Sequence, residues 1–169
     1  FPNHPFKVLD DERMDMLVES IRENGILNPV IVRPDKNGDY EMISGHRRLH
    51  AAGIVGLSKI PAIVKEMSDD EAIIKMVDAN IQREEIMPSE KAFAYKMKLE
   101  AMKRTAGRPT KENACHNGTH LRSDQELALQ VGDSARSIQR YIRLTELIPE
   151  LLECIDNKKL GLVIACLLY

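Results

Sequence analysis

The chain has 169 residues, which is enough for one compact domain or for two small ones. Apolar residues make up 43% and charged residues 30%, a balance that is typical of globular proteins and excludes a wholly disordered chain. The formal net charge is -2, so a basic surface for nucleic acid, if there is one, must be local.

The cysteine content and the apolar runs indicate the cellular compartment. Three cysteines at positions 115, 154 and 166 form an odd set without a Cys-x-x-Cys pair, which argues against a disulfide framework and favours a reducing compartment. The longest apolar stretch, residues 160–169, has about half the roughly 20 residues of a membrane helix. We therefore expect a cytoplasmic protein without a membrane partner. Because the chain begins at Phe1 and stops inside this apolar run, we expect it to be a fragment.

Residues 10–104 predict a small sheet interleaved with helices. Asp10 or Asp11 caps the first helix and Gly25 stops it, and the turn 35–38 joins two strands into a hairpin. Ser68 and Glu71 form a capping box. The expected elements are a helix over 10–24, strands over 30–33 and 40–43, a helix from 44 to about 52 that Gly53 ends, a strand over 60–65, and helices over 68–82 and 88–104.

The remaining residues predict a linker followed by helices only. Residues 106–122 are polar, rich in Gly, Pro and Asn, and without periodicity, which indicates a domain boundary. Helices are expected over 123–130, 134–147, 149–157 and from 160 onward. The expected fold is therefore an α+β domain over 1–106, a linker over 107–122, and an all-α helix-turn-helix domain over 123–169.

Residues 123–145 carry the spacing of a helix-turn-helix. Ala128 is small enough for two helices to cross closely, and Gly132, four residues later, tolerates the backbone of a tight turn. Ser134 is placed to cap the second helix, and Ile138 to bury its inner face.

Three arginines share one stripe of the second predicted helix. Arg136, Arg140 and Arg143 follow at i, i+4 and i+7, and residues 134–145 contain no acid. Arginine pairs with guanine edges, glutamine with adenine, and serine with phosphates. The expected DNA-binding residues are Ser134, Arg136, Ser137, Gln139, Arg140 and Arg143. The alternative is a plain helical hairpin with a solvated basic face.

The segment Ser-Gly-His-Arg-Arg, residues 44–48, lies between a predicted strand and a predicted helix. Backbone N–H groups and the helix dipole favour an anion at such a junction, and two arginines add phosphate contacts. The functional interpretation is a phosphate or nucleotide site at Gly45, His46, Arg47 and Arg48; the alternative is a capped helix with two exposed arginines.

Two further polar clusters give weaker signals. Asn80, together with an acid, could hold a divalent cation beside phosphates, whereas Glu84 and Glu85 are more typical of an ordinary helix end. Residues 115, 116 and 120 of the linker bring together one Cys and two His, too few ligands for tetrahedral zinc.

The order of the motifs along the chain resembles the ParB/RepB family of DNA-partitioning proteins, and the resemblance is strongest to ParB-like proteins of plasmids and integrative mobile elements. The segments that carry it are LVESIRENGILNPVIVRP, YEMISGHRRLHAAG, IPAIVKEMSDDEA and NIQREEIMPSEKAFAY, followed by the predicted helix-turn-helix. It covers nearly the whole chain.

The resemblance implies a CTP-dependent DNA clamp. Such a protein has a nucleotide-binding domain, a helix-turn-helix that reads a palindromic site, and a C-terminal dimerisation domain, and it acts with a ParA-type ATPase on the nucleoid or a plasmid. By analogy, residues 45–48 contact the triphosphate, Asn80 lies near magnesium, and residues 25–30 lie by the base.

Three departures from the family pattern are visible. His46 replaces a usual Glu, and Ala79 stands where a Glu linked to CTP hydrolysis is usual. The Arg-containing segment near the family's N-terminus is reduced to residues 5–7. The resemblance therefore implies CTP binding and at most weak CTPase activity.

Two other function classes compete with the clamp. One is a helix-turn-helix transcriptional regulator without nucleotide switching. The other is an enzyme. The ParB N-terminal fold resembles that of sulfiredoxin, but no Cys precedes Cys115 in this chain, which argues against sulfiredoxin chemistry. A ParB-like nuclease or a serine kinase on the same fold stays open.

Overall fold

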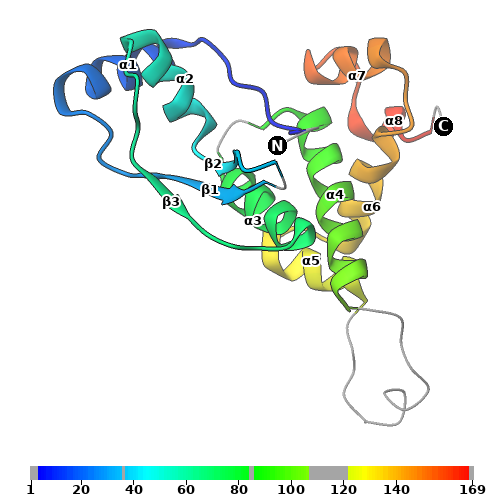
Figure 1. Ribbon diagram of the computed structural model, residues 1–169. Coiled ribbons are helices and arrows are strands. Elements are labelled where there is room, and N and C mark those ends of the chain that lie inside the picture. The colour runs from blue at the N-terminus through cyan, green and yellow to red at the C-terminus, as the bar shows by residue number, and fades with distance from the viewer. Residues whose placement is uncertain (1–3, 36, 84–85, 107–121, 168–169) are drawn as a thin grey trace. The chain divides into compact units, whose positions relative to one another are not determined.

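The computed structural model describes residues 4–35, 37–83, 86–106 and 122–167 (Figure 1). Its internal contacts divide the chain into two compact units, Phe1–Met76 and Val77–Tyr169, which we describe separately.

A three-stranded sheet with the order β2-β1-β3 forms the centre of the first unit. Strands β1 (Val30–Pro34) and β2 (Tyr40–Ser44) pair antiparallel, which confirms the predicted hairpin. Strand β3 (Ala62–Val64) pairs with β1 in parallel and is shorter than the predicted strand. An irregularity between Ile31 and Val32 shifts the register just where Ser44 leads out of the sheet.

Helices α1 (Glu12–Asn24) and α2 (His46–Val55) bury their apolar sides against each other. The core between them contains Met14, Val18, Ile21 and Ala51. Asp11 caps α1, since its Oδ1 accepts a hydrogen bond of 2.8 Å from the Met14 backbone N–H. Both the predicted cap and the stop of α1 at Gly25 are confirmed.

The prediction that Gly53 ends the second helix is wrong. Helix α2 continues to Val55, and Gly56, with a φ of 86°, closes it in the left-handed conformation. The Gly56 N–H donates to the Ala52 and Gly53 carbonyls and so satisfies the helix end. Gly53 keeps a helical backbone, which glycine tolerates at a modest cost.

Helix α3 (Asp69–Ile81) begins in the first unit and ends in the second. The predicted capping box is present. The Ser68 backbone N–H donates to Glu71 Oε2 at 2.8 Å, and the Glu71 N–H donates back to Ser68 Oγ at 3.3 Å. Hydrogen bonds from the backbone and the hydroxyl of Ser68 lower the pKa of Glu71.

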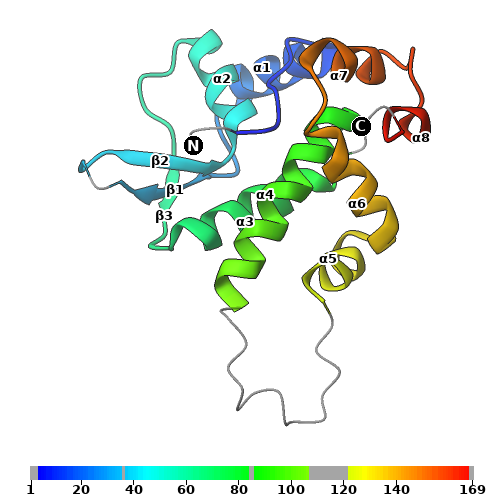
Figure 2. The ribbon, with the colours of Figure 1, turned by 90° about the vertical axis from the view of Figure 1, so that its right-hand side faces the viewer.

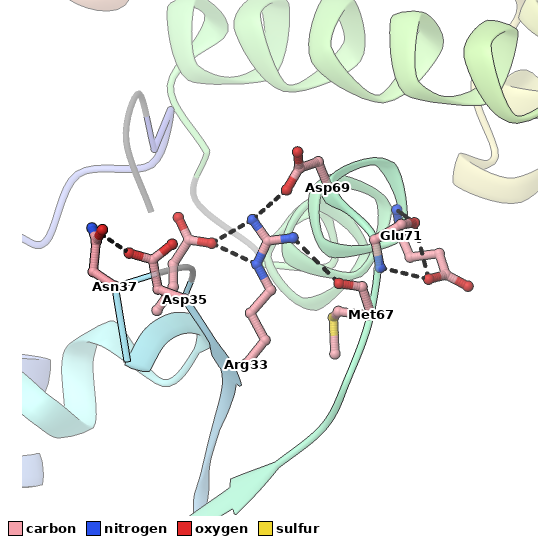
Figure 3. A network of polar contacts seen from close by, with 8 residues as sticks. Arg33, Asp35, Asn37, Met67, Asp69 and Glu71 are labelled. Atoms are coloured by element: carbon pink, nitrogen blue, oxygen red, sulfur yellow. Dashed lines mark hydrogen bonds and ion pairs between the residues drawn. The ribbon is translucent and has the colours of Figure 1, made fainter. Parts of the chain in front are cut away.

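One arginine of β1 ties the sheet to the first turn of α3 (Figure 3). Arg33 forms ion pairs with Glu41 of β2 at 2.6 Å and with Asp69 of α3 at 2.7 Å, and it donates to the Met67 carbonyl at 3.4 Å. Partial burial lowers the pKa of Arg33, but the hydrogen bonds and charges of Glu41 and Asp69 outweigh burial and raise it.

Helices alone form the described part of the second unit from residue 86 onward. Helix α4 (Pro88–Ala106) contacts α5 (Ser123–Val131), α6 (Ala135–Leu144) and α7 (Pro149–Asp156), and α6 and α7 contact α8 (Leu162–Ala165) (Figure 2). Ala92, Leu144, Ile155 and Ala165 form a common core. Ser89, at the start of α4, donates to both oxygens of Asp156 at 2.9 and 2.5 Å.

These contacts divide the chain earlier than the sequence suggested. The prediction assigned residues 88–104 to the N-terminal domain, whereas α4 packs with α5, α6 and α7 and belongs to the second unit. The predicted linker lies almost wholly outside the described residues. Helix α6 ends at Leu144 rather than at residue 147, and the predicted helix from 160 onward is the short α8. Among the described residues, no helix is both long and apolar enough to cross a bilayer.

Candidate nucleotide and nucleic-acid sites

The junction between β2 and α2 requires glycine at position 45. Gly45 has a φ of 110°, which side chains other than glycine rarely adopt. A Cβ at this position would lie 2.6 Å from Val30 Cγ1 of the neighbouring strand. The backbone can therefore lead directly from the sheet into α2.

The first turn of α2 is electropositive. No side chain caps the helix at Gly45, and the first turn contains no acid. The first backbone N–H groups of a helix carry a partial positive charge, which Arg47 and Arg48 reinforce here. The helix start therefore has the local charge that the sequence predicted, and protein groups also contact the two arginines.

Arg47 and Arg48 hold the segments that flank the junction. Arg47 Nη2 lies 3.1 Å from Oδ1 of Asp11, the cap of α1, and its Nε is buried without a hydrogen-bond partner among the described residues. Arg48 Nη1 donates to the carbonyls of Asn28 and Pro29, the latter at 2.7 Å. The two arginines thus fix α1 and the loop before β1 relative to the start of α2.

His46 lies beside a surface pocket of about 640 Å³ on α2. Its ring centre is 4.0 Å from that of His4. His50, one turn later, contacts Asp10 Oδ1 at 2.8 Å. The pocket is lined mainly by apolar groups from Val8, His46, Leu49, His50, Gly53 and Ile54.

Asn80 is buried in the last turn of α3 and belongs to the second unit, whereas the other four predicted nucleotide ligands belong to the first. The described residues contain no cluster of three or more His, Cys, Asp or Glu side chains that could hold a metal ion. Glu84, Glu85 and the linker residues 115, 116 and 120 lie outside the described residues.

Helices α5 and α6 are joined by the short turn Gly132-Asp133-Ser134. Gly132 has a φ of 74°, and Ser134 Oγ accepts a hydrogen bond of 3.0 Å from the Ser137 N–H. Leu127 and Ile138 are fully buried, and Ala128 is buried as well. The local features predicted for this helix pair are therefore present.

The arginine stripe of α6 has no acidic partner among the described residues. Arg136 and Arg143 are exposed and Arg140 is half-buried. Several other described arginines form ion pairs, for example Arg22 with Glu19 and Arg33 with Asp69. The charge of α6 is consequently uncompensated and faces a ligand or solvent.

Two acids that the sequence did not single out contact this helix pair. Asp124, near the start of α5, accepts a hydrogen bond of 3.2 Å from Gln139 Nε2 of α6. Asp133, in the turn, accepts from Tyr95 of α4 at 2.5 Å and pairs with Lys91 at 2.8 Å. Only the i, i+4 spacing of Lys91 and Tyr95 was visible in the sequence.

The Asp133 cluster shifts the ionisation of its members. Burial raises the pKa of Asp133, but hydrogen bonds from Lys91 and Tyr95, together with the Lys91 charge, lower it by more. Burial and the hydrogen bond to Asp133 raise the pKa of Tyr95. At neutral pH, Asp133 is therefore a carboxylate and Tyr95 a hydrogen-bond donor.

A known domain family matches the N-terminal part of the chain. Residues 2–81 match the family model of the ParB N-terminal domain. These residues belong to the ParB N-terminal domain family. This matched range contains the β2–α2 junction and extends to the end of α3. The chromosome-partitioning protein Spo0J of Thermus thermophilus is 35% identical over 156 residues, which cover 92% of the chain and 51% of the relative.

Two further proteins are similar to this chain. A nucleoid occlusion protein of Listeria innocua is 33% identical over 163 residues, covering 95% of the chain and 51% of the relative. The solved structure of the C-terminally truncated chromosome-partitioning protein ParB from Caulobacter crescentus, complexed to the centromeric parS site, shares the fold with a TM-score of 0.59. It is 24% identical, and the match covers 98% of this chain and 77% of that one. The chain spans about half the length of the curated relatives it matches.

Proposed function

We propose that this chain is the DNA-binding and CTP-binding part of a ParB-type partitioning protein, with α6 as its recognition helix. The arginine stripe, which has no acidic partner in the described part of the chain, is the observation that supports DNA binding most directly. The relatives named for chromosome partitioning and the parS complex of the similar Caulobacter crescentus protein support the same function.

Some of the residues proposed to contact DNA would bind base edges and others would bind phosphates. Arg136, Arg140 and Arg143 supply guanidinium groups to guanine edges or phosphates, and Gln139 reads adenine. Ser134 and Ser137 lie at the N-terminus of α6, where hydroxyl and backbone donors suit a phosphate. Because these contacts replace condensed counterions, affinity should fall steeply as salt rises.

An arginine substitution tests the recognition helix. Arg140→Ala should weaken binding to the selected DNA site by about 1–3 kcal/mol and relax the base preference at one position. Arg22→Ala is a matched control, because Arg22 lies on α1 and pairs only with the exposed Glu19 among the described residues. Fluorescence anisotropy with duplexes taken from a random-sequence selection measures both quantities. If Arg140→Ala binds with unchanged affinity and selectivity, the assignment of α6 is wrong.

The junction of β2 and α2 is the proposed site for the CTP triphosphate. Three features of the described residues fit an anion of this kind: the absent Cβ at Gly45, the uncapped first turn of α2, and the buried Arg47 Nε, which has no hydrogen-bond partner among them. Gly45, His46, Arg47 and Arg48 would contact the phosphates, and binding would compete with Asp11 for Arg47.

Magnesium would be held mainly by the nucleotide. Asn80 can offer one amide oxygen, and the described residues contain no cluster of three or more His, Cys, Asp or Glu side chains. Mg²⁺ commonly keeps several waters and binds phosphate oxygens together with one or two protein groups. The proposed role of Asn80 is therefore to orient a Mg–CTP complex. CTP hydrolysis is at most weak in this proposal, because Ala79 has no side chain that could act on water.

Calorimetry separates the clamp from a plain regulator. CTP with Mg²⁺ should bind the wild type, with and without site-containing DNA, and should not bind Arg47→Ala. Arg22→Ala is the control, since it removes an exposed arginine of α1 that pairs with Glu19. Absence of CTP binding by the wild type would leave a helix-turn-helix transcriptional regulator. Mg-dependent DNA cleavage that disappears in Asn80→Ala would instead support a ParB-like nuclease.

The complete protein is proposed to act as a homodimer on a palindromic site and with a ParA-type ATPase, associated with the nucleoid or a plasmid in the cytoplasm. A nucleoid occlusion protein is the second candidate, because the Listeria innocua relative carries that name. Partitioning requires binding sites clustered on the DNA that is moved, whereas action across the nucleoid requires dispersed sites. Mapping the bound sites along the host genome separates the two functions.

A further inference from the structure

A buried acid of α5 holds a side chain of the proposed recognition helix. Asp124 is 7% exposed, and its Oδ2 accepts from Gln139 Nε2 at 3.2 Å and from Arg122 Nη2 at 3.0 Å. Its Oδ1 accepts from the Gln125 backbone N–H at 3.1 Å. The carboxylate thus lies between the start of α5 and the exposed side of α6.

This contact determines which end of the Gln139 amide faces outward. A carboxylate accepts hydrogen bonds only, so rotating the amide by half a turn would place Oε1 against Asp124 and be repulsive. The orientation with Nε2 toward Asp124 leaves Oε1 without a partner among the described residues. One hydrogen of Nε2 also stays available, because Asp124 takes only one of the two.

We propose that Asp124 is a specificity-positioning residue, which makes Gln139 present one acceptor and one donor to the major groove. Adenine offers the complementary pair, a donor at N6 and an acceptor at N7. Guanine offers two acceptors, O6 and N7, and would oppose Gln139 Oε1. This inference rests on the proposed function, in which α6 enters the major groove. Asp124 acts through Gln139 and touches no base itself.

A merely structural role of Asp124 makes a different prediction. If the acid only favours the start of α5 through the helix dipole, its loss lowers stability and weakens binding to every duplex alike. If it orients Gln139, its loss changes the ratio of affinities for two duplexes that differ at one base pair. This ratio is insensitive to a fraction of unfolded protein, because unfolded chains reduce both affinities equally.

Four proteins are compared with the wild type, all as the full chain: Asp124→Asn, Gln139→Ala, the double variant, and Glu126→Gln. Glu126→Gln removes the same charge from the same helix, and Glu126 is exposed. Each protein selects from a random-sequence duplex pool, and anisotropy then measures its affinity for the selected duplex and for the same duplex with each A·T pair replaced by G·C.

At one position the wild type should prefer adenine over guanine by about tenfold, in the range expected for a good bidentate contact. Gln139→Ala should abolish this preference, and Asp124→Asn should reduce it by about threefold or more. In the double variant the preference should equal that of Gln139→Ala, and Glu126→Gln should keep the wild-type value.

Three results would overturn the inference. Asp124→Asn could keep the full preference, Gln139→Ala could change no position, or Asp124→Asn could alter the preference equally when Gln139 is already absent. A wild type that selects no sequence would contradict the proposed function itself, and the inference would fall with it. The selection with the wild type therefore distinguishes failure of the proposed function from failure of this inference alone.

Discussion

Tyr95 of α4 donates a hydrogen bond of 2.5 Å to Asp133, the central residue of the turn between α5 and α6. Lys91, one helical turn earlier, contacts the same oxygen at 2.8 Å and lies 5.0 Å from the centre of the Tyr141 ring. The Tyr95 and Tyr141 rings meet edge to face at 5.7 Å. Helix α4 therefore fixes the residue that directly precedes the cap of α6.

Loss of the Tyr95 hydroxyl should destabilise the second unit. Tyr95→Phe keeps the buried ring but removes the donor to a charged acceptor, a change that costs about 1–3 kcal/mol. Urea unfolding measures the free energy of unfolding. Tyr141→Phe is the matched control, because the described residues offer its hydroxyl no hydrogen bond, and it should change stability by less than about 0.5 kcal/mol. Equal effects of the two substitutions would contradict the importance of the Tyr95–Asp133 contact.

The lowered pKa of Asp133 predicts a loss of stability in acid. Because its pKa lies below the ordinary 3.8 in the folded protein, Asp133 stabilises the fold fully above that value. The contribution is lost as the pH falls through the lower, folded-state pKa. Free energies of unfolding between pH 6 and pH 2 should therefore fall less steeply for Asp133→Asn than for the wild type. If the free energies of unfolding of the two proteins fall in parallel over this pH range, ionised Asp133 does not stabilise the fold.

Substitutions of two glycines, one at the start of α2 and one near its end, should have opposite effects on stability. Gly45→Ala forces a side chain into a φ of 110° and within 2.6 Å of Val30 Cγ1, so it should destabilise the first unit by about 1–3 kcal/mol. Gly53→Ala adds a Cβ that meets nothing within 4 Å apart from the helix's own backbone, and should stabilise the helix by up to about 1 kcal/mol. Thermal unfolding of both variants checks the signs. A neutral Gly45→Ala would disprove the close approach to Val30.

The ion pair of Lys98 and Asp78 should respond asymmetrically to substitution. Lys98 of α4 is 1% exposed, whereas its partner in α3, at 2.5 Å, is 50% exposed. Asp78→Ala leaves a buried ammonium without its acceptor among the described residues and should cost about 3 kcal/mol. Lys98→Met keeps the packing and leaves Asp78 to water, so it should cost less than about 1 kcal/mol. Chemical unfolding measures both, and the reverse order would contradict this explanation.

Local signals in the sequence predicted most of the elements. Ser68 and Glu71 lie three residues apart, so their reciprocal cap could be inferred without tertiary information. The cap that Asp11 provides for α1 is equally local, because its acceptor is used by the N–H three residues later. The segment Gly53-Ile54-Val55-Gly56 contains two glycines, and the sequence analysis predicted the helix end at the first of them. Periodicity does not distinguish them, because the choice depends on which glycine adopts the left-handed conformation, and that is Gly56.

The sequence predicted which residues could form the candidate sites, but it did not predict the contacts that these residues make within the protein. The sequence identified Arg48 and Gln139 as groups that could bind a ligand. Arg48 donates to carbonyls about twenty residues away, and Gln139 donates to an acid fifteen residues away. Such pairings depend on how strands and helices meet in space, which no local pattern encodes. The roles of Asp124 and Asp133 were missed for the same reason.

Helix α3 is shared by the two compact units, and this constrains any attempt to study them separately. A chain cut between Met76 and Val77 would split α3, leaving carbonyls without donors on one fragment and N–H groups without acceptors on the other. A fragment of the first unit should therefore carry α3 through Ile81, the last residue of the family match. The second unit would then begin near Pro88 and would lack Asp78, so that Lys98 loses its acceptor.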